Sequence, residues 1–257
     1  MNFLNAVWLG VVEGITEFLP ISSTGHLILA AKLAGLSQTE YLKSFEIAIQ
    51  LGAILSVVVL YWRSLFVDFA VMKRILAAFL PTAILGVIFY KIVKKFLLSS
   101  DQIVLVSLFT GGILLIVFEL LHHEKEDSIE DLKDLPYRKA VLIGLCQSVA
   151  MVPGVSRSAA TILGGLLLGI KRKTIVEFSF LLAVPTMAAA TALDLIKSSS
   201  HFSNEEFVFL GVGFLTSFIV AILGIKFLLH FIKNHNFIPF GIYRILIAIV
   251  FWWGIYA

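Results

Sequence analysis

The stretch EGITEFLPISSTGHLIL, residues 13–29, combines a membrane-like composition with groups that a buried structural helix does not need. It is apolar, yet it carries Glu13 and Glu17 one helical turn apart, then Pro20, three hydroxyl side chains and His26. A charged side chain at the centre of a bilayer costs about 2.5–3.5 kcal/mol on insertion scales. We therefore expect these groups to have partners and to form a working site.

The composition of the whole chain indicates an integral membrane protein. Of its 257 residues, 59% are hydrophobic and only 14% are charged, whereas roughly 25% are charged in a typical soluble domain. The apolar runs are long enough for helices of about 20 residues, and they lack the alternation of membrane β-strands. We expect an all-α, polytopic membrane protein. The small net charge of +3, with basic residues scattered in loops, argues against nucleic acid as a partner.

Six segments are long enough to cross a bilayer, and two pairs of segments are shorter. The predicted spans are residues 45–62, 75–93, 103–121, 174–196, 207–229 and 239–256. The short pairs are 3–18 with 21–36, broken at Pro20, and 139–152 with 155–170, broken at Pro153-Gly154. A helix of about 16 residues reaches only about 24 Å, less than the hydrocarbon core of about 30 Å. We predict that both pairs are re-entrant helical hairpins.

The two predicted hairpins resemble each other. Residues 10–26, GVVEGITEFLPISSTGH, align with residues 144–160, GLCQSVAMVPGVSRSAA, at an offset of 134 that becomes 133 from the proline, so that Ser23 meets Ser156. Three predicted spans separate the copies, and three is odd, so the second copy is expected to be inverted relative to the first. We predict a single membrane domain, residues 1–257, with repeat one at about 1–121, a cytoplasmic linker at about 122–138 and repeat two at about 139–257.

The lysines and arginines predict the orientation. One side of the predicted bundle holds Arg63, Lys73, Arg74, Lys125, Lys133, Arg138, Lys139, Lys171, Arg172, Lys173, Lys226, Lys233 and Arg244, and the other holds Lys32, Lys43, Lys91, Lys94, Lys95 and Lys197. Cytoplasmic loops carry the excess of basic residues. We therefore expect the first side to be cytoplasmic and both termini to be extracytoplasmic.

Glu13 and Glu17 are the candidate ligands of a metal. At positions i and i+4 they share one helix face. Carboxylates are the ligands that Mg²⁺ or Ca²⁺ prefers, so we expect a divalent cation here. The alternative is that both side chains lie at the membrane edge in headgroup water.

The residues after each break are typical of a helix start that binds an anion. Ser and Thr side chains cap helices, and the free N–H groups of a helix N-terminus attract phosphates. In the second hairpin Arg157 adds a planar guanidinium that can bind two phosphate oxygens; the alternative is an ion pair with Glu17. The predicted substrate-binding residues are Ser22, Thr24, Gly25, Gly154, Ser156, Arg157, Ser158 and Thr161.

His26 lies about one turn from Ser23, a spacing that suits acid–base or nucleophilic work. We predict that Ser23 attacks phosphorus and that His26 manages its proton, with Glu17 and Arg157 as the other catalytic residues. Attack by His26 itself, or by a water held by the cation, remains open. A phosphate site within a membrane favours a substrate with a lipid tail.

These motifs closely resemble those of the bacterial undecaprenyl-pyrophosphate phosphatases, also called bacitracin-resistance proteins. Residues 13–26 match E-x-x-x-E followed by P-x-S-S-T-G-H, and residues 153–161 match P-G-x-S-R-S-x-x-T. The resemblance implies a divalent-cation-dependent hydrolase of the bacterial cytoplasmic (inner) membrane. It implies removal of the terminal phosphate of undecaprenyl (C55-isoprenyl) pyrophosphate on the extracytoplasmic side. This reaction recycles the lipid carrier for cell-wall synthesis and confers bacitracin resistance.

Two other readings compete with this one. A polyprenyl-phosphate transporter or flippase fits inverted repeats equally well, and it would release no phosphate. The acid-phosphatase-like lipid phosphatases need a second histidine six residues after the arginine, where this chain has Leu163. The sequence leaves open whether the chain forms a homodimer.

Overall fold

The computed structural model describes residues 1–37, 39–92, 100–197 and 204–256. Across these residues the regular structure is helical, apart from one isolated bridge between Ile129 and Ile170, so the all-α prediction is confirmed. The helices are α1 (Phe3–Thr16), α2 (Ser23–Leu33), α3 (Glu40–Leu60), α4 (Trp62–Phe66), α5 (Phe69–Ile92), α6 (Asp101–Leu121), α7 (Tyr137–Ser148), α8 (Arg157–Leu167), α9 (Arg172–Lys197), α10 (Asn204–Phe231) and α11 (Ile238–Tyr256), with short 3-10 turns at Leu132–Asp134 and Val149–Met151.

Five helices are long and apolar enough to cross a membrane: α3, α5, α6, α9 and α10. The sixth predicted span corresponds to α11, which is apolar but shorter. Helix α3 begins five residues before the predicted span because Thr39 caps it, its hydroxyl accepting from the N–H of Leu42 at 3.1 Å. Two of the lysines used to predict orientation, Lys94 and Lys95, lie outside the described residues.

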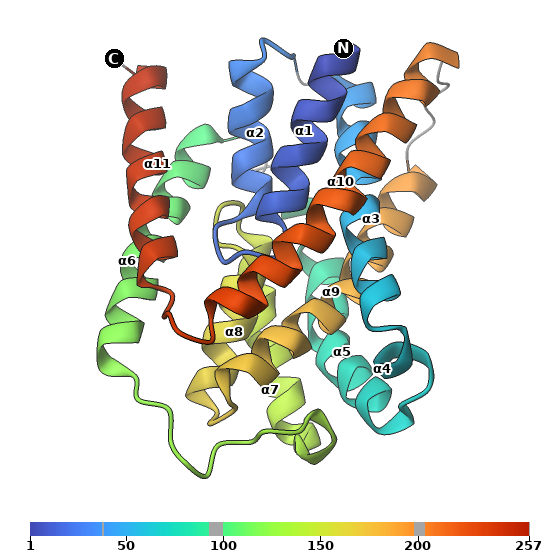
Figure 1. Cartoon of the computed structure of the whole chain (residues 1–257). Helices are drawn as coiled ribbons and strands as arrows, with labels where there is room; N and C mark the ends of the chain where they lie inside the picture. Colours follow the sequence, from blue (N-terminus) through green and yellow to red (C-terminus); the bar gives the residue numbers. More distant parts are fainter. Residues whose placement is uncertain (38, 93–99, 198–203, 257) are drawn as a thin grey trace.

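Helices α1 and α2 form one helical pair and α7 and α8 a second, and the two pairs lie in opposite halves of the molecule. In Figure 1, α1 and α2 occupy the upper half and α7 and α8 the lower half, and the loop of each pair lies near the middle. Helix α1 packs along α10, and α7 packs along α5. The start of α1 and the end of α11 lie at one end of the bundle, and the connection between α6 and α7 lies at the other (Figure 1).

The loop between α1 and α2 is part of the main hydrophobic core, to which it contributes Phe18, Leu19 and Ile21. Phe18 is fully buried and meets Phe180 of α9 edge to face, with ring centroids 5.3 Å apart. This packing places the loop between α1 and α2 against the middle of α9, where the carbonyl oxygen of Ser179 accepts from Arg157 at the start of α8.

The connection between α6 and α7 is fastened to the helices rather than free. The backbone of Ile129 pairs with Gly169 and Lys171 at the turn between α8 and α9. At the end of α6, the buried Glu119 forms an ion pair with Arg172 and also accepts from the backbone N–H of Phe237. Glu119 therefore joins the end of α6 to the start of α9 and to the residue before α11, while the predicted linker is joined to the turn between α8 and α9.

One basic residue lies where the sequence analysis did not place it. Arg244 was assigned to a cytoplasmic loop, but it lies inside α11 and its side chain is 0% exposed. The excess of basic residues on the predicted cytoplasmic side falls by one and keeps its sign. Burial of an arginine among apolar helices requires partners for its donors, and these define the site described next.

Candidate active site

Helix α1 delivers two carboxylates to the middle of the molecule. Gly10 and Gly14 let α1 approach α10 so closely that a Cβ on either would lie 2.7 Å from an atom of α10. On the same helix Glu13 is 0% exposed, and neither of its carboxylate oxygens has a hydrogen-bond partner among the described residues. Glu17 follows at the end of α1 and is 5% exposed. The reading that both side chains lie in headgroup water does not fit this burial.

The starts of α2 and α8 share one unusual backbone conformation. Ser22 and Ser156 have φ values of 73° and 75°, a region that residues other than glycine rarely adopt. Each caps its helix: the Ser22 hydroxyl accepts from the N–H of Gly25 at 3.4 Å, and the Ser156 hydroxyl from that of Ala159 at 3.2 Å. Ser22 is therefore the counterpart of Ser156, at an offset of 134, and the alignment of Ser23 with Ser156 was wrong.

The two helix starts meet. The Ser158 hydroxyl donates to the carbonyl oxygen of Leu19 at 2.9 Å, and so joins α8 to the first loop. At each start the first two backbone N–H groups, those of Ser23 and Thr24 and of Arg157 and Ser158, have no protein partner in the part of the chain that the structure describes. Two helix N-termini that converge in this way favour an anion between them.

Glu17 lies between the two starts and is shared by both. Its Oε2 accepts from the Ser23 hydroxyl at 2.5 Å, and its Oε1 lies 3.3 Å from Nη2 of Arg157. Arg157 Nη1 donates to the carbonyl oxygen of Ser179 at 2.7 Å, while its Nε is buried without a partner in the described residues. The ion pair weighed above as the alternative for Arg157 is present, and Nε is the one guanidinium nitrogen that has no partner among the described residues.

The side chains of His26 and Ser23 are not hydrogen-bonded to each other in the described part of the chain. Its Nδ1 lies 2.8 Å from the carbonyl oxygen of Ser22, and its Nε2 lies 2.9 Å from the hydroxyl of Tyr243. The hydroxyl of Ser23 is directed to Glu17 instead. In this geometry the group placed to accept the proton of Ser23 is a carboxylate, not the imidazole that the spacing suggested.

Three other predicted substrate-binding residues, Thr161, Gly154 and Thr24, have different surroundings. The Thr161 hydroxyl lies 2.6 Å from the Ser179 hydroxyl and near its own helix backbone, so it fixes α8 against α9 rather than facing the gap between the helix starts. Gly154 has φ +92° and lies against Val104, where a Cβ would be 2.5 Å from the carbonyl oxygen, so only glycine fits. Thr24 is half-buried beside the free N–H groups.

Sequence reasoning missed Arg244, which holds the two loops in place. Its guanidinium donates to the carbonyl oxygens of Pro20 and of Gly154 and Val155, one from the first loop and two from the second, at 2.9–3.3 Å. It also donates to two carbonyl oxygens of α6. A charge inside the apolar run GIYRILIAIV is the same signal that singled out Glu13 and Glu17, and it could have identified this residue.

A cation at this site would find the carboxylates of Glu13 and Glu17. No group of three or more His, Cys, Asp or Glu side chains that could hold a metal occurs within the described residues. The unpartnered oxygens of Glu13 nevertheless fit a cation, because a buried carboxylate requires a counter-charge or a donor. Mg²⁺ commonly uses one or two carboxylates and completes its shell with substrate phosphates and water. The residues present therefore fit a divalent cation that binds together with a phosphate substrate.

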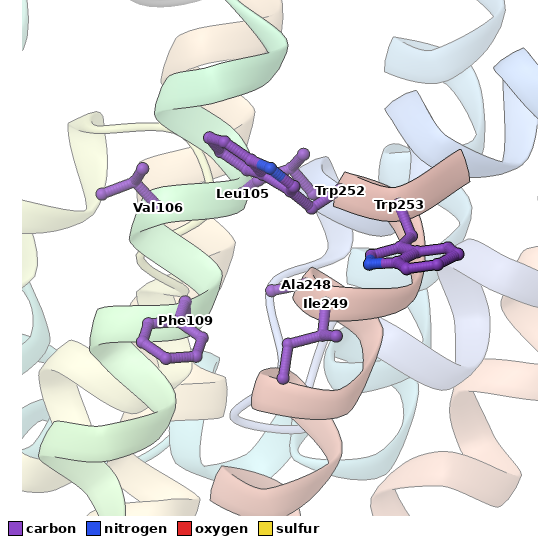
Figure 2. Close-up of a pocket in the computed structure, with 7 residues that line it drawn as sticks. All are labelled: Leu105, Val106, Phe109, Ala248, Ile249, Trp252 and Trp253. Atoms are coloured by element: carbon purple, nitrogen blue, oxygen red, sulfur yellow. The ribbon is translucent and has the colours of Figure 1, made fainter. Parts of the chain in front are cut away.

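A second hollow, between α6 and α11, lacks charged side chains. A groove of about 260 Å³ between α6 and α11 is lined by Leu105, Val106, Phe109, Ala248, Ile249, Trp252 and Trp253 (Figure 2). Its walls are apolar, so it suits a hydrocarbon group and not a phosphate.

Comparison with known proteins identifies the family. The family model described as "Bacitracin resistance protein BacA" matches residues 6–250. An "Undecaprenyl-diphosphatase" of Aquifex aeolicus is 55% identical, and the alignment covers 98% of both chains. Another, of a Sulfurihydrogenibium species, is 57% identical over 98% of this chain and 99% of the relative. One from Methanococcus aeolicus is 43% identical over 97% of both. The family match spans both hairpin motifs and all five long apolar helices, and this chain belongs to the bacitracin resistance protein BacA family.

Proposed function

We propose that this chain hydrolyses undecaprenyl diphosphate to undecaprenyl phosphate and inorganic phosphate. The main observation in support is that the starts of α2 and α8 lie together and bring Ser23 and Arg157 into contact with Glu17. Four unpaired N–H groups and one arginine suit a diphosphate, and a hydroxyl already bonded to a carboxylate suits its cleavage. The names of the full-length relatives support undecaprenyl diphosphate as the substrate.

In the proposed reaction the Ser23 oxygen attacks the terminal phosphorus. Its proton passes to Glu17, which accepts from that hydroxyl at 2.5 Å. The bond from phosphorus to the bridging oxygen breaks, and undecaprenyl phosphate leaves with the bonding electrons. Water then attacks the phosphorus of the phosphoserine, and the bond from phosphorus to the Ser23 oxygen breaks. Glu17 returns the proton that it holds to this oxygen, and inorganic phosphate leaves with the protons of the water. The rival nucleophile, His26, has both ring nitrogens occupied by Ser22 and Tyr243.

Arg157 and the helix starts hold the negative charge that this reaction moves. The N–H groups of Ser23 and Thr24 face one side of the bound phosphates, and those of Arg157 and Ser158 face the other. A guanidinium fork binds two phosphate oxygens and stabilises charge as it develops on them. The Arg157–Glu17 contact, at 3.3 Å, is longer than a typical charge-assisted hydrogen bond, and substrate phosphate can compete for Nη2.

We further propose that Glu13 and Glu17 bind a divalent cation, Mg²⁺ or Ca²⁺, when substrate is present. The unpartnered carboxylate of Glu13 supports this assignment. Bound there, the cation supplies positive charge that neutralises phosphoryl oxygens. Helix α1 keeps the two carboxylates buried on one face.

In the membrane we propose six spanning helices and two re-entrant hairpins, arranged as an inverted repeat. The exchange of partners supports the repeat: α1 of the first hairpin packs on α10 of the second half, and α7 of the second hairpin packs on α5 of the first half. The distribution of lysine and arginine supports extracytoplasmic termini and a site open to that side of the bacterial cytoplasmic membrane. A polyprenyl-phosphate transporter is the second candidate, and the same exchange of partners favours it.

Phosphate release separates the two candidates. Purified protein in lipid, given undecaprenyl diphosphate and Mg²⁺ or Ca²⁺, should release inorganic phosphate with multiple turnovers. A Ser23→Ala variant whose melting temperature equals that of the wild type is the matched control for contaminating phosphatases. It should release almost no phosphate. A wild-type protein that binds the lipid but releases no more phosphate than this control would contradict hydrolysis and favour transport.

A further inference from the structure

Tyr243 joins α11 to the catalytic hairpin through the ring of His26. The hydroxyl lies 2.9 Å from Nε2 of His26, and the two rings are nearly parallel, with centroids 5.5 Å apart and planes 9° from each other. His26 itself is 8% exposed, whereas Tyr243 is 39% exposed on the flank of α11. Neither residue supplies a group to the phosphate chemistry proposed above, so the purpose of the contact requires another explanation.

The partners of His26 determine where its proton lies. Nδ1 is 2.8 Å from the carbonyl oxygen of Ser22, which can only accept, so Nδ1 carries a hydrogen. In the neutral ring Nε2 is then a bare acceptor, and the hydroxyl of Tyr243 donates to it. The neighbouring charge, Arg244, does not compete for Nε2, because its guanidinium donates to five backbone carbonyls.

The ring in turn holds one peptide unit of the site. The carbonyl of Ser22 accepts from the imidazole at 2.8 Å and from the backbone N–H of His26 at 3.2 Å. In a trans peptide the C=O and the following N–H point in opposite directions. A carbonyl held toward the helix therefore directs the N–H of Ser23 outward, toward the space between the two helix starts. Ser22 needs such support because its φ of 73° is a strained conformation for serine.

We propose that Tyr243 is a positioning residue, whose hydroxyl fixes the ring of His26 and thereby orients the Ser22–Ser23 peptide for phosphate binding and attack. The inference rests on the proposed phosphatase function for its kinetic consequence only. The contact itself can be tested without activity. Phenylalanine at position 243 keeps the stacking on His26 but has no hydroxyl to donate to Nε2. The imidazole can then change tautomer, and the Ser22 carbonyl loses its hydrogen bond from Nδ1.

The test compares Tyr243→Phe with Tyr137→Phe. Tyr137 stacks under the guanidinium of Arg74, a contact that phenylalanine preserves, and it lies on α7 away from the hydroxyl network of α2. In lipid, ¹⁵N-histidine NMR should show His26, identified by its loss in His26→Gln, protonated at Nδ1 with a bare Nε2. In Tyr243→Phe the signal should move toward the Nε2–H form that free histidine side chains prefer, and in Tyr137→Phe it should not move.

Kinetics give the second readout. Tyr243→Phe should lower kcat about three- to tenfold, the effect of one neutral hydrogen bond, at an unchanged melting temperature. An unaltered His26 signal, or a kcat equal to that of Tyr137→Phe, would overturn the role of Tyr243. If the wild-type protein releases no phosphate, the proposed function fails, while the NMR comparison still decides whether Tyr243 controls the tautomer of His26.

Discussion

Replacement of Gly111 by alanine tests whether Arg244 holds the site together. Gly111 lies on α6 beneath the guanidinium, and a Cβ there would be 2.1 Å from Nη2. Ordinary contact begins near 3.4 Å, so the guanidinium must move away. Nη2 donates to the carbonyl oxygens of Ser107 at 3.1 Å and of Gly154 at 2.9 Å. Each hydrogen bond from a charged donor contributes about 1.5–3 kcal/mol, so losing both would cost roughly 3–6 kcal/mol.

Gly211→Ala is the matched control, because a Cβ at this helical position meets nothing within 4 Å. Alanine in a helix is favoured over glycine by about 0.5–1 kcal/mol, so the control should be at least as stable as the wild type. Thermal unfolding of both variants in the same detergent measures the difference, and phosphate release measures its effect on the site. If Gly111→Ala unfolds at the temperature of Gly211→Ala and hydrolyses substrate at the same rate, the role assigned to Arg244 is wrong.

Three further predictions follow from the site and its orientation. Arg157→Lys keeps the charge but loses the planar fork, so hydrolysis should fall about tenfold or more; near-normal turnover would count against the phosphate clamp. Glu13→Gln should raise the Mg²⁺ or Ca²⁺ concentration needed for half-maximal activity, and an unchanged metal titration would make this carboxylate structural. In a Cys146→Ser background, an impermeant thiol reagent added to intact cells should label Ser37→Cys and not Glu126→Cys. Labelling at position 126 alone would reverse the topology.

Periodicity and composition predicted the helices well, because apolar length is a local property of the chain. The breaks at Pro20 and at Pro153-Gly154 were also visible locally, and both precede capped helices. The register between the two hairpins was not visible. The sequence alignment paired Ser23 with Ser156, whereas the backbone shows that Ser22 and Ser156 share the positive φ, a property that two adjacent serines do not reveal in the sequence.

The site was predicted in its parts but not in its pairings. Residues inside the two motifs could be recognised because they are polar side chains in apolar segments. Which of them touch depends on contacts between helices distant in the sequence: Glu17 rather than His26 receives the hydroxyl of Ser23, and His26 meets Tyr243, 217 residues later. Arg244 was misplaced because it was counted as a loop charge, although its five acceptors lie on three separate segments.

The most direct test is to trap the phosphoenzyme. Wild type, Ser23→Ala and His26→Ala are each mixed with undecaprenyl diphosphate labelled on its terminal phosphate and quenched in acid on the millisecond scale. Attack by Ser23 predicts an acid-stable label that fragment mass spectrometry places on Ser23 and that is absent from Ser23→Ala. An acid-labile label that persists in Ser23→Ala and disappears in His26→Ala would contradict the mechanism and assign the attack to histidine.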